Sequence, residues 1–415
     1  MKVPEFHALI NYEDEYVQPL IHSALKSNLA ASSYKLVKSL EELPSPEQPF
    51  LQISSYETLP FEHILSHSSS SIANAYIIRK ALIRKHYLST TAFNWVTKNP
   101  KSILKTNMKP SCDFELDYAE FLDDALVEAW ELQEAMQKNE SKEAGEREWW
   151  ILKPGMSDRG QGIRLFSTLE ELQAIFEEWE ADQPNSEDEE DEDAATGADV
   201  SNDKDVIMTS HLRHFTAQPY IHPPLLISSL GSRKFHIRTY VLALGSLSVY
   251  VYKPMLALFA SSPYSPPWES SSDLTAHLTN TCLQPSVKDG TVLSFWSDAL
   301  PLEKTKKEDI FKQICGITGE IFEAAAKGMM VHFQTLPNAF EVFGVDFLVD
   351  DAGTAWMLEI NAFPDFKQTG SELSGIVEGL WNEVVREAVG GFFGERERKG
   401  SDELVLVRTV ELGRR

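Results

Sequence analysis

The chain has 415 residues, of which 42% are hydrophobic and 24% are charged. This composition is ordinary for a globular protein and excludes a wholly disordered, collagen-like or coiled-coil chain. Lys and Arg total 38 and Asp and Glu total 63, and the net charge of −25 argues against bulk electrostatic binding to nucleic acid or to an anionic membrane. At roughly 150 residues per domain, the length predicts two or three domains.

Two further features concern the cellular compartment. The cysteines Cys112, Cys282 and Cys315 lie far apart without the spacing of metal ligands, and no signal peptide is apparent. No apolar run approaches the roughly 18 residues of a membrane-spanning helix. We therefore expect a soluble protein in the cytoplasm.

The first ninety residues are predicted to form a small α/β unit. Strands are expected at residues 6–10, 36–37 and 50–53, and helices at residues 13–27 and 72–88. The next segment, from Arg79 to Lys109, contains eight Lys or Arg residues and no Asp or Glu. It is either a basic helix face balanced by acidic neighbours or a surface for phosphate or an acidic partner.

The middle of the chain combines a long amphipathic helix with a strand pair. Apolar residues recur at helical spacing over residues 116–138, and short strands are expected at residues 149–153 and 162–166. Thr168 and Glu171 have the spacing of a capping box, which predicts the start of a helix that continues to Glu180.

An acidic segment follows, with an unbroken acidic block from Glu187 to Asp193. Like charges repel and no core can form here, so we expect a disordered, solvated loop over residues 182–205. It is either a plain insertion between two elements or a regulatory or partner-binding segment.

The remainder is predicted to contain two strand pairs and two helices. The strands are expected at residues 233–244, 248–252, 340–349 and 356–361. A long helix is expected at residues 305–330, and a final helix should end near Val389 at Gly390 and Gly391. Hairpins with packed helices and no internal repeat indicate an α+β architecture.

The last strand pair carries the clearest candidate site. If its turn is centred between Ala352 and Gly353, Asp346 lies opposite Glu359, and Asn361 shares the face of Glu359. Unpaired carboxylates are costly to bury, and Mg²⁺ prefers such oxygen ligands. The pattern therefore indicates a magnesium site, and the alternative is three polar residues on the surface of an amphipathic sheet.

Two basic segments are candidates for binding phosphate. Lys153 ends an apolar strand, and the loop after it contains Gly155, Gly160 and Gly162, which permit close approach of backbone amides to an anion. By itself this pattern also fits an ordinary hairpin loop. Alternation along residues 233–241 places Lys234, His236, Arg238 and Tyr240 on one strand face, which either meets anions or is a solvated outer face. Residues 216–221 are predicted to form a short extended segment whose backbone groups can face a purine.

Taken together and in this order, five motifs resemble those of the tubulin-tyrosine ligase family, which has an ATP-grasp ligase fold. The motifs are residues 150–154 with the glycine loop, 218–221, 233–238, 277–280, and 343–346 with 359–361. The resemblance extends over roughly residues 76–388 and is closest to a fungal, P-body-associated branch. In that branch the ligase-like region often follows a phosphatase-like domain, and we expect no such domain before it here.

The resemblance implies a nucleotide cleft between two α+β domains. The domains are expected at residues 91–222, including the acidic loop, and at residues 223–393, with the metal site. A small N-terminal α/β domain occupies residues 1–90, and a tail occupies residues 394–415.

The resemblance also implies roles for individual residues. Lys80, Lys153 and Lys234 would contact the phosphates of ATP, and Arg238 would face the acceptor carboxylate. Gln218, Tyr220 and Ile221 would line the adenine pocket, and Asn280 would hold phosphate or metal. Asp346, Glu359 and Asn361 would bind Mg²⁺. Because residues 79–109 border the family cleft, we also expect a basic wall there.

The implied reaction is an ATP-dependent ligation. A carboxylate of a protein or peptide, acidic or C-terminal, becomes an acyl phosphate, and an amino acid then forms the amide. Tubulin is one candidate acceptor, and neither nucleic acid nor membrane is an expected partner.

Two departures from the family pattern leave a second function open. The family usually has Asp where His236 stands, and its tyrosine-adding members have Arg about where Leu258 falls, although Lys253 is a partial substitute. The alternative is therefore a nucleotide-binding or degenerate interaction module, for example in P-body assembly, without tyrosine ligase activity.

Overall fold

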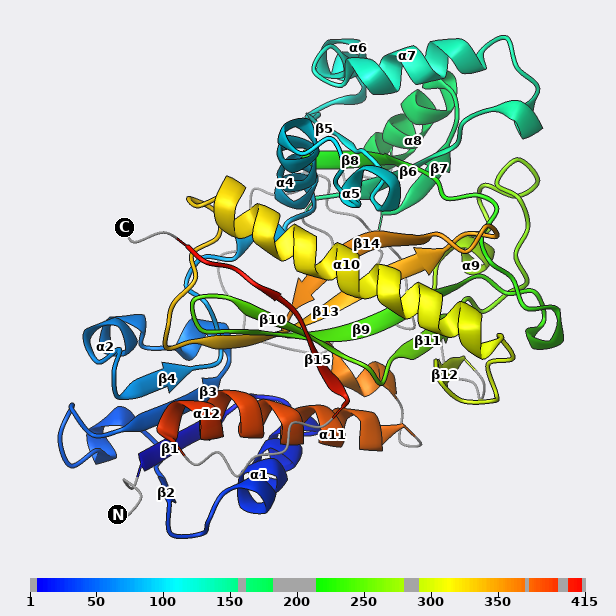
Figure 1. Ribbon diagram of the computed structural model, residues 1–415. Coiled ribbons are helices and arrows are strands. Elements are labelled where there is room, and N and C mark those ends of the chain that lie inside the picture. Colours follow the sequence, from blue (N-terminus) through cyan, green and yellow to red (C-terminus); the bar gives the residue numbers. More distant parts are fainter. Residues whose placement is uncertain are drawn as a thin grey trace, which may run out of the picture.

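Three β-sheets form the framework of the computed structural model (Figure 1), which describes residues 6–155, 162–181, 214–279, 291–369, 373–394 and 402–412. The predicted acidic loop, Gly160 and Asn280 lie outside these residues. The mixture of helices and sheets confirms the predicted α+β class.

The N-terminal sheet is parallel and has the strand order β2-β1-β3-β4. Its strands are β1 (Phe6–Asn11), β2 (Tyr34–Leu36), β3 (Phe50–Ser54) and β4 (Ser71–Ala73). The associated helices are α1 (Val17–Asn28) and α2 (Phe61–Ser66). Parallel strands require crossover connections, which α1 and α2 help to supply.

The prediction of a helix over residues 72–88 is wrong at its N-terminal end. Ile72 belongs to β4, and the helical part comprises α3 (Lys80–Ile83) and α4 (Lys85–Lys98). Residues 71–76 are all buried, and periodicity does not separate a short buried strand from a buried helix.

The middle sheet is antiparallel, with the order β5-β8-β6-β7. Its strands are β5 (Cys112–Glu115), β6 (Trp150–Pro154), β7 (Arg164–Phe166) and β8 (His214–Pro219). Three helices share its hydrophobic core, namely α6 (Leu122–Leu126), α7 (Trp130–Asn139) and α8 (Leu169–Ala181). In Figure 1 this part lies at the top.

Two details of the middle part test the sequence analysis. The predicted helix over residues 116–138 is broken between α6 and α7, so one long helix is wrong. The capping box of α8 is confirmed, because the Glu171 N–H donates to Thr168 Oγ1 and the Thr168 N–H donates to Glu171 Oε2, both at 3.2 Å.

The large sheet has seven strands and carries most of the core. Its strands are β9 (Phe235–Leu244), β10 (Ser248–Tyr252), β11 (Leu256–Phe259), β12 (Val292–Ser294), β13 (Phe340–Val349), β14 (Ala355–Ala362) and β15 (Leu404–Thr409). The central strand β9 pairs with β13 along one edge and with β10 and β11 along the other. Side chains of β13 alternate between two cores: Phe343 and Val345 pack in one and Phe340 and Val342 in the other.

Helices cover both faces of the large sheet. The long helix α10 (Lys304–Gly328) packs on one face, as Figure 1 shows, and α11 (Ser374–Val384) packs on the other and contacts α1 of the N-terminal part. Short helices α5 (Leu104–Asn107) and α9 (Leu274–His277) complete this part. Within the described residues, every helix is too short or too polar to span a bilayer.

The C-terminal region differs from its prediction. The last helix does not end at Gly390 and Gly391 but continues through a π-helical segment into α12 (Gly391–Phe393) and ends at Gly394, whose φ is +77°. Residues 404–409, expected within a tail, form β15 and pair with β10. The run of Leu and Val at residues 404–407 is itself typical of a strand, so the assignment of these residues to a tail overlooked a local signal.

Candidate active site

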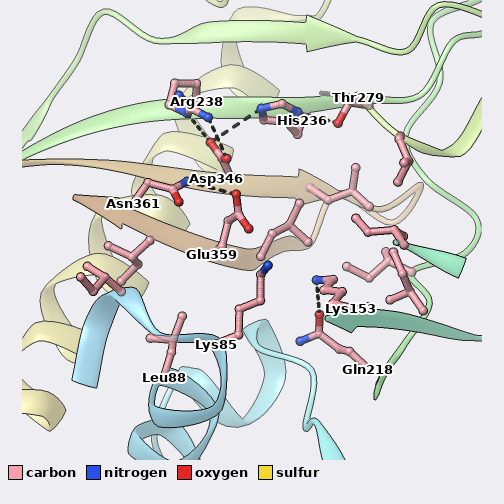
Figure 2. A pocket seen from close by; sticks show the side chains of 18 of the residues that line it. Lys85, Leu88, Lys153, Gln218, His236, Arg238, Thr279, Asp346, Glu359 and Asn361 are labelled. Carbon is pink, nitrogen blue, oxygen red and sulfur yellow. Dashed lines mark hydrogen bonds and ion pairs between the residues drawn. The ribbon is translucent and has the colours of Figure 1, made fainter. Parts of the chain in front are cut away.

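A cavity of about 750 Å³ lies between the middle sheet and the large sheet. Its walls come from β6, from β8 and the residues after it, from β9 and β13, from β14, and from the start of α4 (Figure 2). The cavity thus joins the segments that carry the predicted site residues.

The hairpin of β13 and β14 supplies the acidic wall of the cavity. Asp346 lies opposite Glu359, as predicted, and Asn361 lies opposite Gly344. A bulge follows Asp346, so that Phe347 pairs with Met357. The Asn361 side-chain amide donates to Glu359 Oε1 at 3.0 Å, which leaves the amide oxygen of Asn361 as a potential ligand.

Asp346 is held by basic groups from the neighbouring strand β9. Arg238 donates from Nε to Oδ1 at 2.5 Å and from Nη2 to Oδ2 at 3.0 Å, and His236 Nε2 lies 3.7 Å from Oδ1. Burial alone would raise the pKa of Asp346, but the charges of Arg238 and His236 and the hydrogen bonds bring it below its usual value. Asp346 is therefore a buried, ionised carboxylate.

His236 occupies the place where the family usually has Asp. Its Nδ1 lies 2.6 Å from Thr279 Oγ1, and burial lowers its pKa. The ring is only 5% exposed and adds no negative charge next to Asp346.

Two lysines line the cavity near this acidic wall: the half-buried Lys153 on β6 of the middle sheet, and the buried Lys234 directly before β9 of the large sheet. Lys153 donates to Gln218 Oε1 at 3.1 Å, and burial lowers its pKa to about 8, against an opposing effect of Glu359. Burial lowers the pKa of Lys234 to about 7, and the charge of Lys153 contributes to that shift. Two cations that interact in a partly desolvated cavity are costly unless an anion binds between them.

The structure brings most predicted site residues together at this cavity. Those that line it are Lys153, Gln218, Tyr220, Ile221, Lys234, Arg238, Asp346, Glu359 and Asn361. Lys80 is exposed at the start of α3 and is not among the described residues of the lining. Lys85, the first residue of α4, does line it, and Figure 2 shows its side chain pointing toward Glu359.

The predicted basic wall over residues 79–109 is wrong as a continuous surface. Arg79 is buried, with Nε 2.7 Å from Glu341 Oε1, and lies over the Tyr56 ring. Lys109 lies over Trp356, and of the eight basic residues only Arg84 and Lys85 line the cavity as described. Because three separate helices, α3, α4 and α5, make up this segment, its basic side chains do not all face the cavity.

Sequence reasoning missed two pairs of residues at the cavity, Phe363 with Pro364 and His277 with Thr279. Phe363 follows the metal-site motif with φ of +48°, and Pro364 packs so closely that a Cβ on Gly344 would lie 2.9 Å from its Cβ. His277 and Thr279 also line the cavity, and their place in the fourth motif was the available signal.

Comparisons with known proteins agree with this geometry. The model of the tubulin-tyrosine ligase family matches residues 82–396. A probable tubulin--tyrosine ligase of Schizosaccharomyces pombe is 44% identical over 405 residues, covering 97% of this chain and 96% of that protein. Probable tubulin--tyrosine ligase PBY1 of Saccharomyces cerevisiae is 44% identical over 406 residues, covering 94% of this chain but 52% of that protein.

A solved structure is also similar over nearly the whole chain. The C-terminal domain from K. lactis Pby1, described as an ATP-grasp enzyme interacting with the mRNA decapping enzyme Dcp2, is 36% identical with a TM-score of 0.73. The alignment covers 98% of this chain and 99% of that one. The chain thus belongs to the tubulin-tyrosine ligase family and has the ATP-grasp fold.

Proposed function

We propose that the protein is an ATP-dependent carboxylate–amine ligase that acts on a protein or peptide. The observation that carries this proposal is one cavity that is lined by Lys153 and Lys234 together with Asp346 and Glu359. Such a site has cations for phosphate and oxygen ligands for a divalent cation within a single enclosed space.

The basic and polar residues have separate tasks in this proposal. Lys153, Lys234 and Lys85 bind the phosphates, with Lys85 in place of the exposed Lys80. Gln218, Tyr220 and Ile221 line the adenine end of the cavity. The role proposed for Asn280 is unchanged, although this residue lies outside the described part of the chain.

The donor set fits Mg²⁺. Asp346, Glu359 and the Asn361 amide oxygen are hard ligands, and each Asp346 oxygen keeps a lone pair beyond its hydrogen bond to Arg238. Asp346, Glu359 and Asn361 would hold the ion. When bound, Mg²⁺ would neutralise the charge of the phosphate oxygens.

The proposed reaction needs no nucleophile from the protein. The acceptor carboxylate attacks the γ-phosphorus, ADP leaves, and the resulting acyl phosphate is attacked by the amine of an amino acid, which releases phosphate and a proton. The protein positions these groups and stabilises charge. Because both carboxylate oxygens of Asp346 accept hydrogen bonds from Arg238, we assign Arg238 to fixing Asp346 and no longer to binding the acceptor.

The proposal does not specify the class of amino acid that is added. Leu258 is fully buried on β11 and lies in the hydrophobic core, so this position supplies no group for a carboxylate. Lys253 does not replace it, because its Nζ lies 3.7 Å from Glu308 Oε1 and 4.9 Å from the Trp296 ring centroid. Tyrosination in particular is therefore not part of the proposal.

A second candidate function is a nucleotide-binding interaction module in the cytoplasm, for instance at P-bodies. The similarity to K. lactis Pby1, which interacts with Dcp2, favours it. In that case the cavity would bind nucleotide to stabilise a conformation that docks a partner protein.

One experiment separates the two functions. The purified protein is incubated with Mg-ATP, amino acids and peptides that end in or contain acidic residues, and ADP release and peptide mass are recorded. The ligase proposal expects ADP release that depends on the peptide, with a mass gain equal to an amino acid minus water. Nucleotide binding without either signal favours the interaction module.

A further inference from the structure

Lys234 makes its closest polar contact with Tyr220. Its ammonium lies 3.0 Å from the Tyr220 hydroxyl and 4.2 Å from the ring centroid. The two residues are only 7% and 8% exposed, and both line the cavity. A flexible lysine side chain is thus fixed by a hydroxyl and by the face of a ring.

Tyr220 links Lys234 to His277 through hydrogen bonds in which each group donates to the next. An ammonium only donates, so the Tyr220 oxygen accepts from Lys234, and its own proton points to His277 Nδ1, 2.8 Å away. The other ring nitrogen, Nε2, lies 3.0 Å from the Ser270 carbonyl, which only accepts. Nε2 of His277 is therefore protonated, and because burial lowers the pKa of His277, the neutral ring with Nδ1 as acceptor is favoured.

We propose that Tyr220 and His277 are positioning residues for Lys234, whose ammonium they hold where it meets a nucleotide phosphate. Tyr220 keeps one proton of the ammonium engaged and leaves two for the ligand, while His277 orients the Tyr220 hydroxyl. This inference rests on the proposed binding of ATP. It assigns a task to side chains in the segments 218–221 and 277–280.

Electrostatics around Lys234 make this anchor necessary. Burial lowers the pKa of Lys234, and Lys153 on β6 adds repulsion. His222 after β8, His236 on β9 and His277 on α9 are further titratable groups that interact with Lys234, and Tyr264 forms a hydrogen bond with Tyr220. The acceptor oxygen of Tyr220 favours the charged form of Lys234, so its removal should reduce the charged fraction.

A double-mutant cycle in the full 415-residue chain tests the proposal. Tyr220→Phe keeps the ring but removes the hydroxyl, and Lys234→Met removes the ammonium at similar length. We expect Tyr220→Phe to weaken Mg-ATP binding by about 3- to 10-fold in calorimetry, the effect of one hydrogen bond. In the Lys234→Met background the same change should alter affinity by less than about twofold.

The control is Tyr76→Phe. Tyr76 is also buried and its hydroxyl donates to the Gly245 carbonyl at 2.9 Å, but it is not among the described residues that line the cavity. It should lose similar stability and keep its Mg-ATP affinity. His277→Leu should weaken binding in the same direction as Tyr220→Phe.

Two results would overturn this inference and leave the proposed function intact. One is wild-type Mg-ATP affinity in Tyr220→Phe, and the other is an equal loss of affinity on Tyr220→Phe in the wild-type and Lys234→Met backgrounds. If Lys234→Met abolishes measurable binding, the pH dependence decides. The alkaline fall in affinity must then shift to lower pH in Tyr220→Phe, and an unshifted curve overturns the inference. Failure of the wild-type protein to bind Mg-ATP would instead overturn the proposed function and this inference with it.

Discussion

Arg238 on β9 lies directly opposite Asp346 on β13, and its guanidinium binds both oxygens of the Asp346 carboxylate. Bidentate pairing of this kind fixes the direction of a side chain as well as its charge. The consequence is a carboxylate whose orientation toward the cavity is set by the sheet.

Loss of Arg238 is expected to destabilise the fold. Arg238→Met leaves the buried Asp346 carboxylate without its ion-pair partner, and we expect the free energy of unfolding to fall by about 3–5 kcal/mol. Urea unfolding at neutral pH measures this loss. Adding Asp346→Asn to Arg238→Met should restore part of it, and a loss below about 1 kcal/mol in the single variant would contradict the pairing.

Mg-ATP affinity is expected to fall as the pH rises from 7.5 to 9.5. Burial lowers the pKa of Lys234 to about 7 and that of Lys153 to about 8, so both lose charge at alkaline pH in the free protein. Because phosphate binds the charged forms, binding above these values requires proton uptake, and affinity should drop by up to about tenfold per pH unit for each group. Calorimetry in buffers of different ionisation enthalpy detects the uptake, and constant affinity over this range would exclude the roles of both lysines.

Lys85 and Lys80 form a matched pair of variants. Lys85 lines the cavity, whereas Lys80, five residues earlier, is exposed. Lys85→Ala should weaken Mg-ATP binding by about tenfold, a typical loss for a charged hydrogen bond, and Lys80→Ala by less than about twofold. A larger loss of Mg-ATP affinity in Lys80→Ala than in Lys85→Ala would assign the phosphate contact to Lys80 instead.

Much of the site could be predicted because its determinants are local. Strand alternation and a short turn fix the pairing of Asp346 with Glu359, and the capping box of α8 needs only four residues. That Lys85 rather than Lys80 lines the cavity was not predictable, since the break between the short helix α3 and the longer helix α4, at the extended residue Arg84, decides which side chain faces the cavity.

Long-range contacts account for part of the remaining differences. Residues 404–409 pair with the distant strand β10, and the hydrogen bonds between Arg238 and Asp346 join residues 108 positions apart. The break between α6 and α7 is also invisible in the pattern, because apolar residues recur on both sides of Val127.

Gly344 is expected to be intolerant of a side chain. A Cβ there would lie 2.9 Å from the Cβ of Pro364 and 3.4 Å from the Cδ of Arg238, and neither neighbour can move freely in a packed sheet. Gly344→Ala should reduce the free energy of unfolding by about 1–3 kcal/mol.

Gly375→Ala is the control for this substitution. Gly375 lies in α11, and no described atom comes within 4 Å of the place that a Cβ would take there, so alanine should be neutral or stabilise the helix by up to about 1 kcal/mol. Thermal unfolding compares the two variants. Equal melting temperatures would contradict the close packing of Pro364 on β13.

The most direct test of the account is a calorimetric titration of ATP, with and without Mg²⁺, into the wild-type protein and Glu359→Gln. This substitution removes one charge from the acidic wall with little change of shape. We expect Mg²⁺ to increase the ATP affinity of the wild-type protein. In Glu359→Gln this increase should be at least about tenfold smaller, while the affinity for ATP without Mg²⁺ should change little. Equal Mg²⁺ dependence in both proteins would contradict the assignment of the cavity as a Mg-ATP site.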